Sequence, residues 1–299
     1  MSASPGAEEA ALLRAMREHL PEAPGVEPHL AAALAQVVAS PGSLLRARLV
    51  IVAAHSHGLH EAAGAQLACA VEYFHAASLL LDDLPCMDDA SLRRGQPCAH
   101  RVHGEATAIL AALALINRAH VLAGLAYAAH PAGVRVQALL LLDSSLGVDG
   151  LVGGQARDLR YGERATGRRE VAGIAATKTG ALFQLALVLP VLAGGPGPEE
   201  FRLLKALALY WGQWYQACDD MKDLLATPAV TGKDAGRDRA LGRPNLALAL
   251  GPALARRRIA RLEAQLARTR SRLAQLGPQW DYLEQFPDNL SEKGRVRAA

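Results

Sequence analysis

Aspartates gather in two short clusters, and each cluster follows a long apolar stretch. The first cluster occupies residues 81–89 (LDDLPCMDD), and the second occupies residues 216–223 (QACDDMKD). Carboxylates this close together repel one another, and the helix macrodipole disfavours them further at the C-terminal end of a helix. A bound cation removes this conflict. Because the shared donors are carboxylate oxygens, the pattern favours Mg²⁺ over zinc.

Basic residues accompany both acidic clusters. Arg93 and Arg94 follow the first cluster, Lys178 begins an apolar stretch, and Lys233 follows the second cluster. Mg²⁺ often completes its coordination shell with phosphate oxygens of a substrate. The guanidinium fork of Arg also suits phosphate, whereas Lys acts as a point charge. The sequence therefore predicts a site for a diphosphate, held by metal ions and by cationic side chains.

The elements that position these residues are predicted to be helices. Apolar residues recur at helical spacing along most of the chain, with breaks at Pro24-Gly25, Pro41-Gly42 and Gly153-Gly154. We predict helices at residues 6–20, 28–39, 43–57, 61–83, 104–128, 133–147, 168–189, 198–225, 244–276 and 278–285. No stretch alternates at period two for long, so a sheet is not expected. We predict a single all-α domain over residues 1–299.

Two polar loops are expected within this helical background. They lie at residues 83–103 and 226–244, and each follows an aspartate cluster. In a continuous helix Asp219 and Asp223 share one face, whereas Pro85 must interrupt the helix that carries Asp82. Because long loops in a compact domain are usually functional, the chemistry is expected at these two helix ends.

Composition excludes several classes of protein. The 299 residues are 51% hydrophobic, 4% aromatic and 20% charged, and the net charge is 32 − 29 = +3. This composition excludes intrinsic disorder and a small disulfide scaffold, and the small charge does not indicate nucleic acid as a partner. Four cysteines without a CxxC pair favour a reducing compartment. We expect a cytoplasmic protein without a signal peptide or a membrane span.

The two clusters and three shorter motifs together resemble the trans-isoprenyl diphosphate synthases, the polyprenyl synthetase family. Residues 78–95 (SLLLDDLPCMDDASLRRG) are similar to the family's first aspartate-rich motif in the version with two inserted residues. Residues 215–223 (YQACDDMKD) resemble its second motif. The shorter motifs GEAT (104–107), GGQ (153–155) and KTGALF (178–183) stand in the family's order. The resemblance covers about residues 30–250.

The resemblance implies a fold and a reaction. The fold is the type I isoprenoid synthase bundle, an all-α arrangement of helices around a central cavity, usually in a homodimer. Three Mg²⁺ ions with bound diphosphate promote departure of the diphosphate of an allylic substrate. The double bond of isopentenyl diphosphate then attacks the allylic carbocation, and a proton is lost. Geranylgeranyl and farnesyl diphosphate synthases are the nearest kinds of enzyme implied.

Roles for individual residues follow from the same resemblance, position by position. The metal ligands implied are Asp82, Asp83, Asp88, Asp219 and Asp223. The allylic diphosphate is implied to bind Arg93, Lys178 and Lys233, with Thr179 and Gln216 facing the carbocation. Isopentenyl diphosphate is implied to bind Arg46, His75 and Arg94. Asp82, Asp83, Asp88, Asp219, Lys178 and Thr179 are therefore the expected catalytic residues.

One basic motif of the family is changed in this sequence. A Gly-Lys-Arg-x-Arg-Pro run aligns here with residues 42–47 (GSLLRA), so Ser43 and Leu44 replace two cations, and Arg48 is an added one nearby. Loss of a direct phosphate contact costs about 1–3 kcal/mol. We expect a weakened or altered site for isopentenyl diphosphate beside an intact ionisation site.

Product length is argued from residues on the helix before the first cluster. Ala77 stands five residues before the first Asp, where farnesyl-forming relatives often carry a large aromatic, and its small side chain opens the cavity floor. Tyr73 lies one turn deeper on the same face, with Phe74 beside it, and could close the cavity again. We predict a C20 product, geranylgeranyl diphosphate, with C15 as the next expectation.

Two other functions remain open from the sequence. A synthase-like class I terpene cyclase would ionise an allylic diphosphate without using isopentenyl diphosphate. Ser43 and Leu44 favour that reading, whereas His75, Arg46 and Arg94 oppose it. A regulatory subunit of a heteromeric prenyl synthase is the third hypothesis, which the completeness of both acidic clusters opposes.

Overall fold

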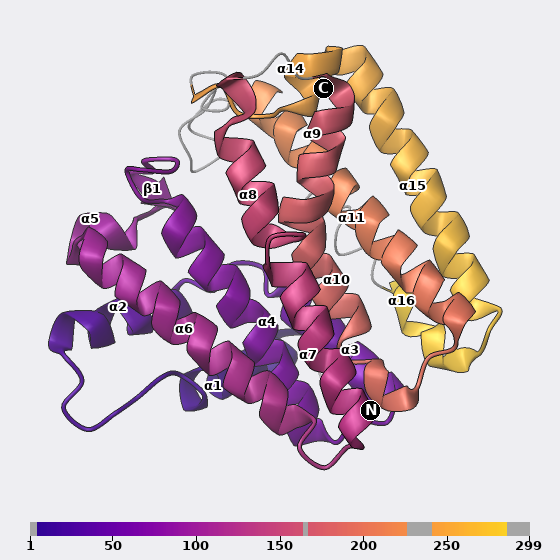
Figure 1. Ribbon diagram of the computed structural model, residues 1–299, viewed down its shortest axis with the longest axis horizontal. Helices are drawn as coiled ribbons and strands as arrows, with labels where there is room; N and C mark the ends of the chain where they lie inside the picture. The colour runs from indigo at the N-terminus through magenta and orange to yellow at the C-terminus, as the bar shows by residue number, and fades with distance from the viewer. Residues whose placement is uncertain (1–4, 164–166, 226–240, 286–299) are drawn as a thin grey trace. The chain divides into compact units, whose positions relative to one another are not determined.

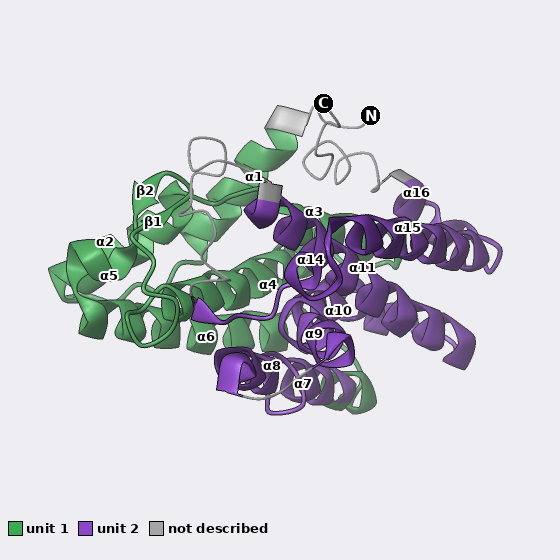
Figure 2. Ribbon diagram, turned by 90° about the horizontal axis from the view of Figure 1, so that it is seen from above, with its two compact units in different colours: residues 1–136, 232–234 green, residues 137–231, 235–299 purple. Residues whose placement is uncertain are grey.

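The computed structural model describes residues 5–163, 167–225 and 241–285 (Figure 1). The all-α prediction is confirmed, because every long element is a helix. The chain divides into two compact units, which Figure 2 colours separately. One unit comprises residues 1–136 with 232–234, and the other comprises residues 137–231 with 235–299.

The first unit is built around two long helices, α4 and α6, which lie side by side. Alanines such as Ala68 and Ala77 on α4 and Ala111 and Ala119 on α6 are fully buried, so the two helices can approach closely. The elements of this unit are α1 Pro5–Glu18, α2 Pro28–Ala39, α3 Leu45–Ser56, α4 Glu61–Asp82, α5 Ala99–His103 and α6 Glu105–Ala126. Helix α7 (Ala132–Leu146) crosses into the second unit.

The second unit places an apolar helix, α10, at its centre. Seven side chains of α10, from Ala181 to Val188, are buried, which explains why this helix is apolar on all sides. It packs on α11, where a Cβ on Gly212 would lie 2.4 Å from the Cα of Gly180, so the two backbones nearly touch. The helices are α8 Leu151–Leu159, α9 Arg168–Ile174, α10 Gly180–Val188, α11 Pro198–Leu225, α14 Leu246–Leu250, α15 Pro252–Ala274 and α16 Tyr282–Gln285. A π-helical turn, Ala175–Thr179, joins α9 to α10, and short 3₁₀ turns lie at Tyr161–Glu163, Leu192–Gly194 and Pro278–Trp280.

Three expectations about local structure were wrong. The Gly153-Gly154 pair does not break the chain, because both residues lie inside α8, where packing overrides the low helix propensity of glycine. Residues 244–276 form two helices, since Gly251 adopts a φ of 79° between them. The expected loop at 83–103 contains α5 and a small antiparallel hairpin, β1 Leu92–Arg93 with β2 Gln96–Pro97.

Within the described ranges, three helical stretches are long and apolar enough to cross a membrane, judged by length and composition alone. They are Glu105–Ala126, Ala132–Leu159 and Arg168–Val188. Only the third is mostly buried, at 61% of its most apolar window, whereas the first is 39% buried and the second 28%. The expectation that the chain has no membrane span stays a prediction.

Candidate active site

The first aspartate cluster folds into a tight turn at the end of α4. Helix α4 ends at Asp82, as Pro85 requires, and residues 84–87 form a loop after it. The N–H of Asp88 then donates to the carbonyl oxygen of Asp82 at 2.9 Å, and the N–H of Ala90 donates to that of Asp83 at 3.1 Å. The two-residue insertion therefore closes a loop that brings Asp82 and Asp88 together. Both of these side chains are half-buried.

Asp83 forms an ion pair with Arg93. Its carboxylate is buried, and its Oδ1 and Oδ2 accept from Nε of Arg93 at 3.1 and 3.2 Å, with a further contact from Nη2. Burial acts to lower the pKa of Arg93, but the hydrogen bond and the charge of Asp83 raise it above its ordinary value. Asp83, placed among the metal ligands by resemblance, is here engaged with a cation. Its structural effect is to hold Arg93 beside the cluster.

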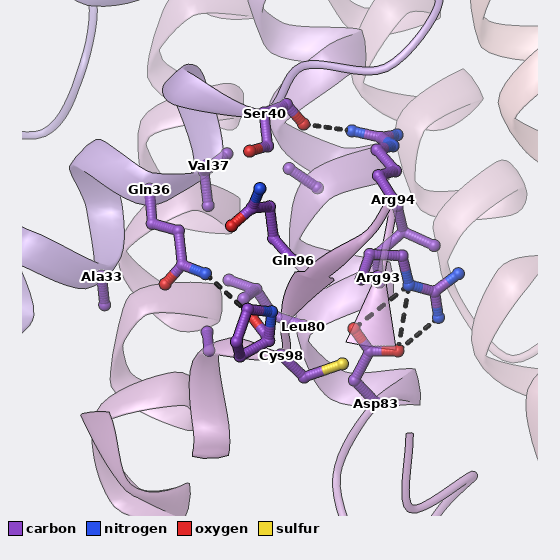
Figure 3. Close-up of a pocket in the computed structure, with 14 residues that line it drawn as sticks. Ala33, Gln36, Val37, Ser40, Leu80, Asp83, Arg93, Arg94, Gln96 and Cys98 are labelled. Carbon is purple, nitrogen blue, oxygen red and sulfur yellow. Dashed lines mark hydrogen bonds and ion pairs between the residues drawn. The ribbon is translucent and has the colours of Figure 1, made fainter. Parts of the chain in front are cut away.

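A small pocket lies between the hairpin, α2 and α4, all within the first unit (Figure 3). Its volume is about 70 Å³, and its polar lining comprises Gln36, Ser40, Asp83, Arg93, Arg94 and Gln96. Nη1 of Arg94 donates to the Ser40 carbonyl at 2.5 Å, and Gln36 donates to the Pro97 carbonyl at 3.0 Å. These bonds attach the hairpin to α2 and hold Arg94 near the changed basic motif at residues 42–47.

The other residues assigned to isopentenyl diphosphate lie on neighbouring helices of the first unit. Arg46 is buried in the first turn of α3, and His75 is half-buried on α4. Leu44, which stands where the family carries a cation, is 2% exposed and belongs to the core. Ser43 is exposed. The structure therefore explains Leu44 as a packing residue.

The second aspartate cluster lies within the last turns of α11, in the second unit. Asp219 and Asp223 are half-buried and four residues apart in one continuous helix, so they share a face as predicted. Asp220 is buried, with 1% exposure, and has a different role. It accepts from Nε2 of Gln216 at 2.9 Å and from the N–H of Leu246 at 2.7 Å, which fixes α14 against α11.

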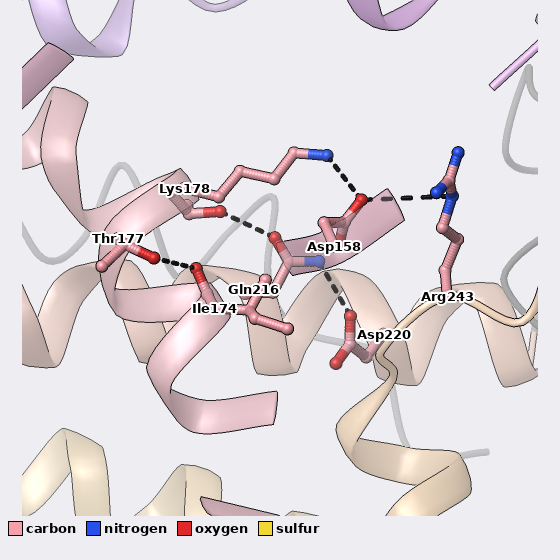
Figure 4. Close-up of polar contacts among 8 residues, drawn as sticks. Asp158, Ile174, Thr177, Lys178, Gln216, Asp220 and Arg243 are labelled. Atoms are coloured by element: carbon pink, nitrogen blue, oxygen red, sulfur yellow. Dashed lines mark hydrogen bonds and ion pairs between the residues drawn. The ribbon is translucent and has the colours of Figure 1, made fainter. Parts of the chain in front are cut away.

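Lys178 and Thr179 belong to the π-helical turn, a rare conformation that is frequent at functional sites. Oγ1 of Thr179 donates to Oε1 of Gln216 at 2.8 Å, so the two residues assigned to the carbocation touch each other. Nζ of Lys178 donates to Asp158 at 3.2 Å (Figure 4). A Cβ on Gly154 would lie 2.6 Å from the backbone nitrogen of Lys178, so glycine is required for α8 to contact this turn.

Asp158 and Arg243 were missed by sequence reasoning. Asp158 is 7% exposed, and its Oδ2 lies 3.2 Å from Nζ of Lys178 and 4.0 Å from Nε of Arg243 (Figure 4). One buried carboxylate therefore holds two cations. The sequence did offer one signal for Asp158: this acid lies four residues after Gly154 on an amphipathic helix, so both residues share one face. Arg243 carried no signal, and Lys233 lies outside the described residues.

The residues assigned to product length are all buried in the first unit. Ala77 and Tyr73 are fully buried, and the hydroxyl of Tyr73 donates to the carbonyl of Met16 on α1. The ring of Phe74 makes an edge contact with His120 on α6, with centroids 4.9 Å apart. Tyr73 and Phe74 therefore point to different neighbours, one to α1 and the other to α6.

The donor set fits magnesium. Among the described residues, no group of three or more His, Cys, Asp or Glu side chains is already gathered as a metal site. Mg²⁺ needs only one or two carboxylates when water and substrate phosphate complete its shell. Asp82 with Asp88, and Asp219 with Asp223, each provide such a pair on their own unit.

Known proteins resemble this chain over most of its length. Residues 27–275 match the family model described as polyprenyl synthetase. A geranylgeranyl diphosphate synthase of Pseudescherichia vulneris is 39% identical over 231 residues, which cover 76% of this chain and 73% of that protein. One of Pantoea ananas is 36% identical over 239 residues, which cover 79% and 76% of the two chains.

Solved structures show the same fold. A geranyltransferase of Helicobacter pylori complexed with magnesium and isoprenyl diphosphate has a TM-score of 0.83 at 24% identity, with 98% of each chain covered. An FPP/GFPP synthase of Zymomonas mobilis has a TM-score of 0.78 at 28% identity, with 92% of each chain covered. The paired acidic clusters, the family match over most of the chain and these relatives together show that the chain belongs to the polyprenyl synthetase family.

Proposed function

We propose that this protein is a prenyltransferase that condenses isopentenyl diphosphate with an allylic diphosphate and releases geranylgeranyl diphosphate. The observation that carries the proposal is that each unit presents a pair of half-buried carboxylates and a cation that is held in place by a buried acid. In the first unit these are Asp82, Asp88 and Arg93, and in the second Asp219, Asp223 and Lys178. The names of the relatives at 36–39% identity support the C20 product.

Asp82, Asp88, Asp219 and Asp223 would hold magnesium, three ions by the resemblance. When bound, magnesium neutralises the diphosphate and stabilises the charge that develops on it as it leaves. Arg93, Lys178 and Lys233 are proposed, from the resemblance, to bind the allylic diphosphate through their positive charges. The carboxylate partners of Arg93 and Lys178, which are Asp83 and Asp158, hold these two side chains in place before the substrate arrives. Because these side chains are already oriented, they need not move when charge develops on the diphosphate during the reaction.

Thr179 and Gln216 stabilise the allylic carbocation. Oγ1 of Thr179 donates its proton to Oε1 of Gln216, so its own lone pairs remain available to face a positive charge. Gln216 is itself fixed through Asp220. Arg46, His75 and Arg94 bind the diphosphate of isopentenyl diphosphate, whose double bond attacks the cation. The proton lost at the end passes to the released pyrophosphate.

The deciding experiment supplies Mg²⁺, isopentenyl diphosphate and C5, C10 or C15 allylic primers, and analyses products before and after phosphatase treatment. Longer prenyl alcohols that appear only after phosphatase treatment support elongation. Hydrocarbons formed without isopentenyl diphosphate would replace the proposal with terpene cyclisation. No turnover unless a second polypeptide is added would identify a regulatory subunit. Neither alternative is favoured by the relatives, whose names are those of synthases.

Product length tests the cavity residues. If Tyr73 closes the cavity floor, Tyr73→Ala lengthens the main product beyond C20, because the removed ring leaves space below Ala77. Chromatography of the dephosphorylated alcohols reads out the change. An unchanged product in a folded variant shows that Tyr73 is not the floor and serves only to anchor α1 through Met16.

We further propose a homodimer in the cytoplasm. Helix α6 carries large apolar side chains on the face opposite its buried alanines, and these are 39–55% exposed: Ile109, Leu110, Leu113, Val121 and Leu125. A contiguous exposed patch of this kind marks an interaction surface. The four cysteines form no disulfide with one another, which supports a reducing compartment. Cell fractionation tests the location.

A further inference from the structure

Helix α3 begins without a cap of its own. Its N-cap residue, Leu44, offers no side-chain hydrogen bond to the first turn. The first N–H groups of a helix have no partner within the helix and need an acceptor from elsewhere. This helix start is important because it carries Arg46, a cation assigned to isopentenyl diphosphate.

The missing acceptor comes from another helix. Glu72 lies on α4, is 4% exposed, and its Oε1 accepts from the N–H of Ala47 at 3.1 Å. A carboxylate is favoured at this position because the N-terminus of a helix carries partial positive charge. Glu72 also precedes His75 by three residues, so the two side chains lie on the same side of α4.

Glu72 is buried next to cations. Burial raises the pKa of Glu72 above its ordinary value, and the positive charge of Arg46, the N–H of Ala47 and then the charge of Arg94 offset part of this rise. The carboxylate therefore lies within electrostatic range of both arginines assigned to isopentenyl diphosphate. In return, the carboxylate offsets the cost of burying Arg46, which is 7% exposed.

The segment before α3 is shaped around Arg94. Gly42 has a φ of 71°, and a Cβ there would lie 2.4 Å from the guanidinium carbon of Arg94, so the side chain rests on the bare backbone. Leu44 adopts a left-handed φ of 48° while its side chain is buried in the core. A non-glycine residue keeps this conformation only where its surroundings enforce it. Burial of Leu44 and the bond from Ala47 to Glu72 therefore hold the turn from both sides.

We infer that Glu72 is a positioning residue for the isopentenyl diphosphate site, which it organises by capping the first turn of α3, where Arg46 lies. This inference rests on the proposed function. It also accounts for the changed basic motif. Leu44 replaces a phosphate contact with a packing contact, and a buried acid holds the helix start that carries Arg46.

The test is Glu72→Gln, which keeps the size and the hydrogen-bond acceptor but removes the charge. The KM for isopentenyl diphosphate should rise about tenfold, while the KM for the allylic primer stays within twofold. Glu61→Gln on the exposed start of the same helix is the matched control and should change neither value. Circular dichroism and the unfolding temperature establish that each variant is folded. A loss of packing alone would affect both substrates together and would not produce this split.

Two results would overturn the inference. One is an unchanged KM for isopentenyl diphosphate in folded Glu72→Gln, while the wild type elongates primers normally. The other is a parallel rise in both KM values. If the wild type elongates no primer at all, the proposed function fails instead.

A second measurement does not depend on the variant. Hydrogen exchange of the wild type with isopentenyl diphosphate alone should slow in residues 42–50 and remain unchanged in α15. Exchange in residues 42–50 that is indifferent to isopentenyl diphosphate, in an active enzyme, would contradict the inference even if Glu72→Gln does not fold.

Discussion

At the scale of single residues, the candidate site is a set of charges that hold one another in place. Asp83 holds Arg93, Asp158 holds Lys178 and Arg243, and Asp220 holds Gln216. Carboxylates in these clusters therefore divide into two kinds. The buried ones orient cations and amides, whereas the half-buried ones are the proposed ligands of magnesium.

Asp158→Asn tests whether the buried acid positions Lys178. The substitution removes the charge that faces both Lys178 and Arg243, so Lys178 is held less firmly against the allylic diphosphate. We expect kcat/KM for the allylic primer to fall ten- to hundredfold, about 1.4–2.7 kcal/mol, with the KM for isopentenyl diphosphate within twofold. Steady-state kinetics with each substrate varied in turn measure this. Glu163→Gln, at an exposed ion pair with Arg160, is the control, and equal losses in both variants would refute the role.

Thiol reactivity reports on burial around both clusters. Burial raises the pKa of Cys69 and of Cys218 to about 12, and only the thiolate is nucleophilic. At pH 8 iodoacetamide should therefore modify exposed Cys86 alone in the native protein, and all four cysteines after denaturation. Because pH 9 is still far below 12, Cys69 and Cys218 should remain unmodified there. Peptide mass spectrometry reads the sites, and fast labelling of Cys218 in the folded protein would be inconsistent with this account.

At the scale of elements, glycine and a π-helical turn position the second half of the site. Gly154 lets α8 reach the turn that carries Lys178, and Gly212 lets α11 contact the start of α10. The turn therefore lies between two close backbone contacts. Thr179 reaches Gln216 because α10 and α11 are this close.

Gly212→Ala should destabilise this arrangement. The added methyl would lie 2.4 Å from Cα and 2.7 Å from the nitrogen of Gly180, and backbone atoms cannot move aside cheaply. We expect the free energy of unfolding to fall by about 1–3 kcal/mol, measured by urea denaturation. Gly124→Ala on α6 meets nothing within 4 Å and should instead be neutral or gain up to about 1 kcal/mol. An equal change in the free energy of unfolding of the two variants would show that the close contact does not affect stability.

At the scale of the whole molecule, the chain consists of two helical units, and each carries one acidic cluster. The exposed apolar face of α6 belongs to the first unit and is too apolar for an ordinary solvated helix.

Oligomeric state tests that face. Light scattering after size-exclusion chromatography should give a mass of about twice 31.6 kDa for the wild type. Leu113→Glu should weaken the dimer at least tenfold, because it buries a charge in an apolar interface. Leu254→Glu, at an exposed position on α15, should leave the dimer intact. A wild type that is monomeric and that binds lipid vesicles in a flotation assay would assign the α6 face to a membrane surface instead.

Sequence alone was enough for the helical class and for the family, because both depend on local patterns. Helical spacing of apolar residues recovers most helices, and the acidic motifs are short segments whose order along the chain can be read directly. The break at Pro85 and the shared face of Asp219 and Asp223 were likewise predictable, since each follows from covalent geometry or from the helical repeat.

Partners distant in the chain were decided by tertiary structure. Asp158 pairs with Lys178, Asp83 pairs with Arg93, and Glu72 caps α3. These contacts depend on which segments pack together, and no local sequence pattern specifies that. The Gly153-Gly154 pair was read as a break for the same reason, because its use is a close contact with another segment. The amino-acid sequence thus determined which residues are candidates for the chemistry. Packing determined which of them are buried and paired with a neighbour, because burial and pairing of charges arise only when the helices meet.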